Sequence, residues 1–125
     1  MRKMLVAGII LGIIAFSWGY EGRAVDRVCT DMITRLTLLE QYLTQDRQTV
    51  MRAAQEVNES WDEHEKVMEI FIPHDDTDSV NIQQASLMGC IETENYNRAL
   101  IVIRELKAHF AEIQKKSHVG LKNIF

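Results

Sequence analysis

A chain of 125 residues has room for one domain, with a core large enough to fold without disulfides or metals. Hydrophobic residues make up 46% and charged residues 26% of the sequence, which is typical of a globular chain rather than a disordered one. The formal net charge is −4, and no basic block with interleaved aromatic residues is present, which argues against a nucleic-acid surface.

The N-terminal segment is predicted to be a helix that spans a membrane. Arg2 and Lys3 precede an uncharged stretch, residues 4–20, which as a helix would extend about 26 Å, near the lower limit for crossing the hydrocarbon core of a bilayer. Trp18 and Tyr20 lie where an interfacial aromatic belt is expected. By the positive-inside rule, the two basic residues keep the N-terminus in the cytoplasm and send the remainder outside.

A cleavable secretory signal is the alternative for the same segment, residues 1–23. Residues 5–16 have the length of a signal-peptide hydrophobic region, and Ser17 and Gly19 supply small residues two positions apart, as a signal peptidase requires. The aromatic flank and the lack of an Ala-x-Ala motif favour the retained anchor. In either case the bulk of the chain is expected to be extracytoplasmic.

The remaining chain is acidic. Arg2, Lys3, Glu21 and Arg23 together carry +2, so removing them from −4 leaves −6 on residues 24–125. Because like charges repel within a Debye length, we expect this part to stand off an anionic lipid surface.

Apolar residues beyond the anchor recur at alternating steps of three and four, a spacing that predicts amphipathic helices packed in a bundle. The pattern is strong in three segments and weaker in a fourth, residues 79–93. In chain order, the stripes consist of Val25, Cys29, Met32, Leu36, Leu39 and Leu43; Val50, Ala54, Val57, Trp61, His64, Met68 and Phe71; Val80, Leu87, Met88 and Ile91; and Tyr96, Ala99, Ile103, Leu106, Phe110 and Ile113.

Polar segments separate the stripes. Asp46 is predicted to cap a helix that begins at Arg47, and the stretch "PHDDTD", residues 73–78, is predicted to be a turn in which Asp78 caps the next helix. Gly120 is expected to stop the last helix. Connections this short make neighbouring helices antiparallel.

We therefore predict an all-α protein in three parts. An N-terminal transmembrane helix, residues 1–23, is followed by an antiparallel up-down four-helix bundle, residues 24–116, and by a C-terminal tail, residues 117–125. The first bundle helix can run straight on from the membrane span.

Four marks of this sequence resemble a bacterial family of small single-span proteins of spore-forming Firmicutes, domain-of-unknown-function family 4363. The marks are the short anchor, Asn58 with Trp61, "PHDD" at residues 73–76, and the terminal "LKNIF" at residues 121–125. The resemblance covers essentially the whole chain. It implies membrane association and a sporulation context, and it supplies no reaction and no catalytic residues.

The histidines and acidic residues between Glu59 and Asp78 raise the question of a metal site. His64 lies in a predicted interior stripe and His109 at a similar height of the last helix, so both could share a layer, as metal ligands do in bundles. The Glu-x-x-His pair of di-metal bundles is absent, and "HDDTD" lacks the glycine and final glutamate of an EF-hand loop. We expect no metal and no cofactor; a ligand- or metal-sensing bundle that uses His64, His109 or the His74–Asp76 turn is the alternative.

The structural interpretation of the same stretch places Trp61 and His64 in the core together with Leu106 and Phe110. The indole N–H of Trp61 is then expected near a polar partner, which His64 could provide.

The two cysteines are expected to be buried thiols. Cys29 and Cys90 lie at heights that differ by roughly 10 Å along the bundle, too far for a disulfide.

We predict a membrane-anchored extracytoplasmic bundle that is an interaction or structural module and not an enzyme, because no nucleophile elbow, phosphate loop or zincin spacing is found. The expected partner is a membrane protein or a second copy of the chain, and no nucleic acid. The tail either folds back on the bundle or inserts into the partner. The candidate contacts are His74, Asp75 and Asp76 in the membrane-proximal turn, and Asn123, Ile124 and Phe125 in the tail.

Overall fold

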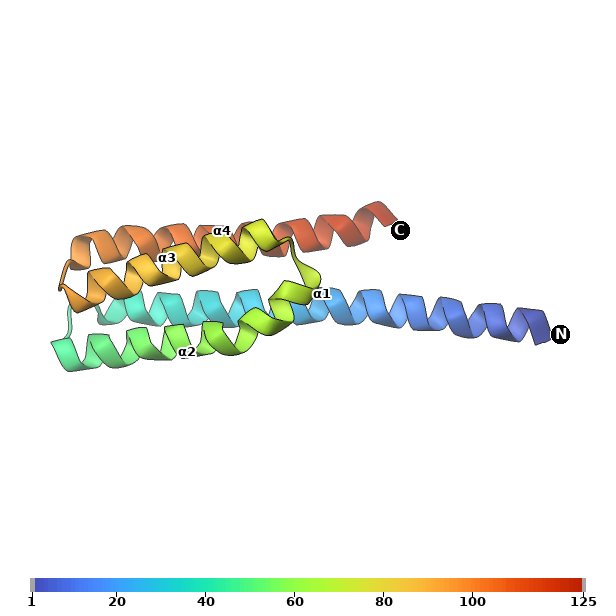
Figure 1. Cartoon of the computed structure of the whole chain (residues 1–125), viewed down its shortest axis with the longest axis horizontal. Coiled ribbons are helices and arrows are strands. Elements are labelled where there is room, and N and C mark those ends of the chain that lie inside the picture. Colours follow the sequence, from blue (N-terminus) through green and yellow to red (C-terminus); the bar gives the residue numbers. More distant parts are fainter. Residues whose placement is uncertain (1, 125) are drawn as a thin grey trace.

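The computed structural model describes residues 2–124, although the side chains of residues 14–22 and 118–124 lie outside the described part. The described chain consists of four helices and contains no strand (Figure 1). The helices are α1 (Arg2–Tyr42), α2 (Arg47–Phe71), α3 (His74–Glu92) and α4 (Tyr96–Ile124). The predicted all-α class is confirmed.

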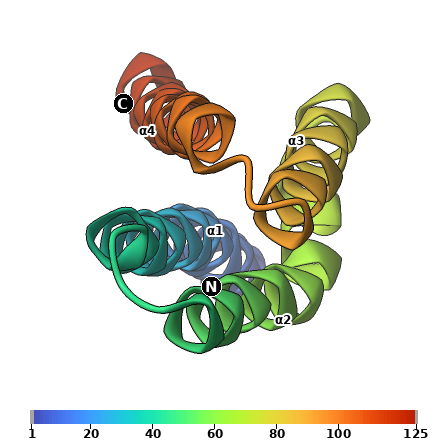
Figure 2. The same cartoon turned by 90° about the vertical axis from the view of Figure 1, so that its left-hand side faces the viewer.

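The helices run alternately up and down, because each connection is only a few residues long (Figure 1). Each helix packs against its neighbours in sequence, and α1 also packs against α4. Figure 2, seen along the helices, shows that these four contacts form a closed ring. The predicted up-down bundle is therefore present.

The core of the bundle consists of the apolar stripes. In α1 the residues that follow the three–four spacing are almost fully buried, as are those of α4 from Ala99 to Ile113. The largest fully buried side chains are Trp61, Phe110, Met32, Leu36, Leu39, Met68, Leu87, Ile91, Ile103, Leu106, Val25 and Val50. Removing this apolar surface from water is the main force that holds the four helices together.

The start of α2 is as predicted. Asp46 has extended backbone angles (φ −65°, ψ 155°), and its carboxylate accepts hydrogen bonds from the Thr49 backbone N–H at 3.3 Å and from the Thr49 hydroxyl at 2.6 Å. The cap satisfies one of the backbone donors that have no partner within the helix.

The start of α3 differs from the prediction. Residues 74–78 are helical, so the turn predicted at residues 73–78 and the cap predicted at Asp78 are wrong. Pro73 precedes the first helical residue with φ −59°, an angle already suited to a helix start. Asp75 and Asp76 in the first turn add favourable charge at the positive end of the helix dipole.

The end of α4 also differs. The helix continues to Ile124, so Gly120 does not stop it, and residues 117–124 extend the helix instead of folding back as a separate tail. A glycine inside a helix costs only about 1 kcal/mol relative to alanine, and the flanking turns outweigh this cost. Phe125 lies outside the described residues.

The first helix is continuous from Arg2 to Tyr42, and its N-terminal part projects beyond the bundle (Figure 1). Within the described part of the chain, the helices contain no stretch that combines the length and the hydropathy needed for a membrane span. The predicted span, residues 4–20, runs into residues 14–22, whose side chains lie outside the described part. The described apolar side chains of this segment are exposed: Met4, Leu5, Val6, Ile9, Ile10, Leu11 and Ile13.

Candidate functional site

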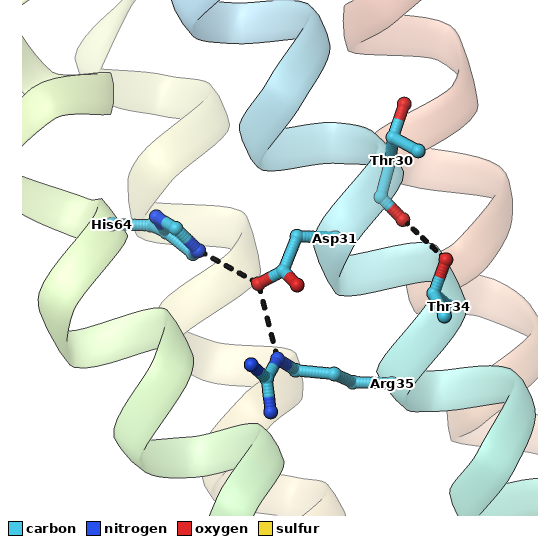
Figure 3. A network of polar contacts seen from close by, with 5 residues as sticks. All are labelled: Thr30, Asp31, Thr34, Arg35 and His64. Atoms are coloured by element: carbon cyan, nitrogen blue, oxygen red, sulfur yellow. Dashed lines mark hydrogen bonds and ion pairs between the residues drawn. The ribbon is translucent and has the colours of Figure 1, made fainter.

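Polar side chains join each pair of neighbouring helices, and we call each set of such contacts a seam. The first seam lies between α1 and α2. His64 on α2 contacts Asp31 on α1, with 2.8 Å between Nε2 and Oδ2 (Figure 3). Arg35, one turn further along α1, donates from Nε to the same oxygen at 3.0 Å. A carboxylate can only accept, so the Nε2 atom of His64 carries the proton in this contact. The seam therefore ties the two helices with a half-buried charged hydrogen bond.

The pKa of Asp31 reflects this position. Desolvation raises the pKa of the carboxyl, but the hydrogen bonds from His64 and Arg35, together with their charges, lower it by more, so that the net pKa lies below the ordinary value. Asp31 is thus held as a carboxylate by its two partners.

The second seam lies between α2 and α3 and holds the buried tryptophan. The indole N–H of Trp61 donates to Asn81 Oδ1 at 2.7 Å, and the Asn81 amide donates to Glu65 Oε1 at 2.7 Å. The Trp61 ring packs edge-on against Phe110, with 5.6 Å between the ring centroids. The expectation that His64 is the partner of Trp61 is therefore wrong. His64 turns toward α1, whereas the indole turns toward α3.

The third seam joins α1 and α4. Glu40 accepts from Lys107 Nζ and from Arg104 Nε, both at 3.2 Å. The hydrogen bond from Lys107 is the main reason that the pKa of Glu40 lies below its ordinary value. Lower in the bundle, the Gln114 amide donates to Asp26 and, at 3.2 Å, to the Thr30 hydroxyl.

The fourth seam, between α3 and α4, is the least satisfied. His109 Nε2 lies 3.7 Å from Asp76 Oδ1, which is too long for a hydrogen bond, and this buried atom has no hydrogen-bond partner among the described residues. Gln84 on α3 is 3% exposed, and within the described chain neither atom of its amide has a partner. This interior position carries a polar group that the protein leaves without a hydrogen bond.

The two histidines considered as metal ligands lie on different seams. His64 faces Asp31 on α1 at 2.8 Å, whereas His109 lies 3.7 Å from Asp76 on α3. Among the described residues, no three histidine, cysteine, aspartate or glutamate side chains gather in a way that could hold a metal ion.

The cysteines lie in the core. Cys29 and Cys90 are both buried free thiols, as predicted. Burial, and in second place the charge of Asp26, raise the pKa of Cys29 to about 12. A thiol with this pKa stays protonated at neutral pH, which makes it a poor nucleophile.

The structure spreads the predicted contact and core residues over different environments. Trp61, Leu106 and Phe110 are buried, and His64 is half-buried. His74 and Asp75 are exposed in the first turn of α3, whereas Asp76 is half-buried beside His109. The helix α4 includes Asn123 and Ile124, whose side chains lie outside the described part, as does Phe125.

Sequence reasoning missed the residues that join the helices, above all Asp31, Asn81 and Glu40. Each lies beside an apolar stripe instead of on it, and each contacts a residue that is distant in sequence. The i,i+4 spacing of Asp31 and Arg35 is the local signal that could have identified the first of these seams.

A family model described as "Domain of unknown function (DUF4363)" matches residues 20–124 of the chain. No curated protein matches, and no solved structure matches.

Proposed function

The chain belongs to the family described as domain of unknown function (DUF4363), and from this premise we propose that it is a membrane-anchored, extracytoplasmic helical bundle that acts as a non-catalytic interaction or structural module. The single observation that carries the proposal is the exposure of the N-terminal part of α1. Between Met4 and Ile13, seven large apolar side chains are 51–84% exposed on a helix that projects from the bundle (Figure 1).

A helix that is apolar on all sides requires apolar surroundings. The bundle does not supply them, since the segment lies beyond the ends of α2 and α3 (Figure 1). A bilayer does, and the uncharged residues 4–20 are long enough to reach across most of its hydrocarbon core. We assign this segment as a single membrane span.

The orientation follows from the flanking charges. Arg2 and Lys3 favour a cytoplasmic N-terminus, which places the bundle on the opposite side of the membrane. The sporulation context implied by the family resemblance is part of the proposal, and it predicts that the protein accumulates during sporulation and not in vegetative growth, as an immunoblot over a growth curve would measure.

A structural or interaction role is supported by how the ionisable groups are used. Asp31, His64 and Glu40 are each engaged by side chains of another helix, and these contacts hold the helices in register. Their positions at helix–helix seams suit a rigid scaffold whose outer faces meet other molecules.

Carbonate extraction of membranes tests the anchoring. The double variant Ile9→Lys, Ile13→Lys introduces two charges in the proposed span, each of which costs about 2.5–3.5 kcal/mol at the centre of a membrane helix. We expect the wild-type chain to stay in the membrane pellet and the double variant to move to the soluble fraction.

The control is Ile82→Lys, because Ile82 is an exposed isoleucine on α3, at 71% against 60% for Ile9 and 61% for Ile13. This variant should stay in the pellet like the wild type. Release of the wild-type chain by carbonate, or equal behaviour of the double variant and the wild type, would refute the anchoring.

The partner we propose is a membrane protein or a second copy of the chain that contacts the first turn of α3. His74 and Asp75 are exposed there, at the end of the bundle that faces the proposed span. A photo-crosslinking amino acid at position 74 should give a discrete adduct in native membranes, whereas the same group at Gln55, exposed on α2, should not. Adducts at both positions, or at neither, would argue against this contact.

A further inference from the structure

The relation between α1 and α4 sets the height of the C-terminal end of the chain. The two helices are antiparallel, and Gln114 on α4 contacts Asp26 and Thr30 on α1. Each residue beyond Gln114 therefore moves α4 one position toward the N-terminus of α1, since both helices rise by the same amount per residue. By this register Ile124 lies level with about residue 18 of α1.

The other two helices end higher. His64 contacts Asp31, so the last residue of α2, Phe71, lies level with about residue 24 of α1. The end of α4 thus passes the base of the bundle by roughly six residues, or about 9 Å. Figure 1 shows the C-terminal end of α4 projecting past the connection between α2 and α3, on the same side as the N-terminal part of α1.

The proposed membrane span ends at Tyr20. The C-terminal end of α4 therefore reaches the level at which the span leaves the hydrocarbon core and meets the lipid headgroups. The headgroup region adds only about 5–8 Å to each side of the hydrocarbon core. An α4 that reaches the level of about residue 18 cannot avoid the headgroup layer if α1 crosses the bilayer along its own axis.

The charges near the base of the bundle are divided between its two sides. Among the described side chains, the side formed by α1 and α4 carries more basic than acidic residues: Arg23, Arg27, Lys115 and Lys116 against Asp26 and Glu112. The side formed by α2 and α3 carries one basic residue against five acidic ones: Lys66 against Glu65, Glu69, Asp75, Asp76 and Asp78.

The lysines of α4 are available for a surface contact. Lys115 and Lys116 are exposed, and so are Arg23 and Arg27 on α1. Lys116 has an i,i+4 contact with Glu112 at 3.8 Å, but both side chains are largely exposed, and such pairs contribute little. By the same register Lys115 and Lys116 lie level with about residues 27 and 26 of α1, about 10 Å beyond Tyr20, so that their long side chains can extend toward the anionic phosphate groups of the lipid.

We propose that the C-terminal end of α4, residues 115–124, docks on the anionic lipid surface beside α1, so that the bundle is held to the membrane at two places and its acidic α2–α3 side faces away. The inference rests on the proposed membrane anchor. It replaces the expectation that the bundle as a whole stands off the lipid surface: the net charge of the domain is acidic, but the charge is not uniformly distributed.

Amide hydrogen exchange of the full-length chain in lipid nanodiscs tests the docking. The exchange of residues 117–124 is compared in discs of phosphatidylcholine alone and in discs that also contain phosphatidylglycerol. We expect slower exchange in the anionic discs, and loss of this difference in the variant Lys115→Gln, Lys116→Gln. Each lysine near an anionic surface shifts the docked population by about fivefold.

The matched control is Arg52→Gln, Lys66→Gln, which removes two exposed cations of α2 and should leave the difference between the lipids intact. Equal exchange of residues 117–124 in both lipids, or an unchanged difference in the Lys115, Lys116 variant, would overturn the docking. Failure of the wild-type chain to enter the discs at all would instead refute the membrane anchor, so the two failures can be told apart.

Discussion

Gln84 shows at the scale of one residue what the interior of this bundle tolerates. An amide buried without a hydrogen bond costs about 1–3 kcal/mol, because it gives up its contacts with water and receives none in return. Gln84 is 3% exposed, and its amide has no partner among the described residues. The residue therefore lowers the stability of the fold at its own position.

Replacing this amide should stabilise the protein. We expect Gln84→Leu to raise the free energy of unfolding by about 1–3 kcal/mol, measured by urea denaturation followed by circular dichroism. Gln55→Leu is the control, since Gln55 is exposed on α2 and its replacement should change the value by less than about 0.5 kcal/mol. A loss of stability in Gln84→Leu would show that the amide has a partner, such as an ordered water.

Asp31 predicts a dependence of stability on pH. Its pKa is lower in the folded chain than the ordinary value of 3.8, so its contribution is complete above the unfolded pKa and is lost as the pH falls through the folded pKa. We expect the wild type to be more stable than Asp31→Asn at pH 6, with the difference shrinking below about pH 4.

Urea denaturation of both proteins between pH 3 and pH 7 measures this difference. Asp62→Asn, at an exposed position of α2, is the control and should track the wild type throughout this range. A difference between wild type and Asp31→Asn that stays constant from pH 6 to pH 3 would contradict the account of the Asp31, His64 and Arg35 seam.

At the scale of the helices, Gly89 is a glycine inside α3 that lowers the stability of this helix. A side-chain carbon added at Gly89 would meet nothing within 4 Å, and the backbone there is helical. Glycine loses more conformational freedom on folding than alanine does, so Gly89→Ala should stabilise the protein by about 0.4–1 kcal/mol.

The reverse substitution on the same helix is the matched test. Ala85 is exposed one turn before Gly89, and Ala85→Gly should destabilise by about 0.5–1 kcal/mol. Thermal denaturation of the two variants should move the midpoint in opposite directions. A lower midpoint for Gly89→Ala would show that α3 needs the freedom of a glycine at this position.

The helices also show which parts of the fold can be predicted from sequence and which cannot. The three–four spacing located the buried face of each helix, because burial depends on the periodicity of one helix at a time. The seams depend on how two helices are placed relative to each other, which no single stripe encodes. For this reason the sequence favours His64 as the partner of Trp61, whereas the partner in the structure is Asn81.

The predictions of two helix ends, the start of α3 and the end of α4, failed for a different reason. Pro73 and Gly120 are both residues that commonly mark an end, but their effect depends on the neighbouring turns. Pro73 begins α3 directly because the following residues can form a favourable first turn, and α4 continues through Gly120. The predicted start of α2 at Asp46 and the end of α2 just before Pro73 are therefore confirmed, whereas the cap predicted at Asp78 and the stop predicted at Gly120 are wrong.

At the scale of the whole molecule, α1 belongs both to the bundle and to the segment outside it. Its residues from Val25 to Leu39 contribute to the core of the bundle, and its residues from Met4 to Ile13 project beyond the bundle. A helix of this kind fixes the bundle to whatever surrounds its N-terminal part (Figure 1). The proposed function and the docking of α4 both depend on those surroundings being lipid.

Labelling of single cysteines in intact cells tests this claim most directly. Ile9, Ile13 and Ile82 are 60%, 61% and 71% exposed, so cysteines at all three positions would react with a maleimide in the isolated chain, while the native Cys29 and Cys90 are buried. With a membrane-impermeant maleimide, we expect Ile82→Cys to react in intact cells and Ile9→Cys and Ile13→Cys to react only after detergent is added. Reaction of all three at equal rates in intact cells, or of Ile82→Cys only after lysis, would contradict the account.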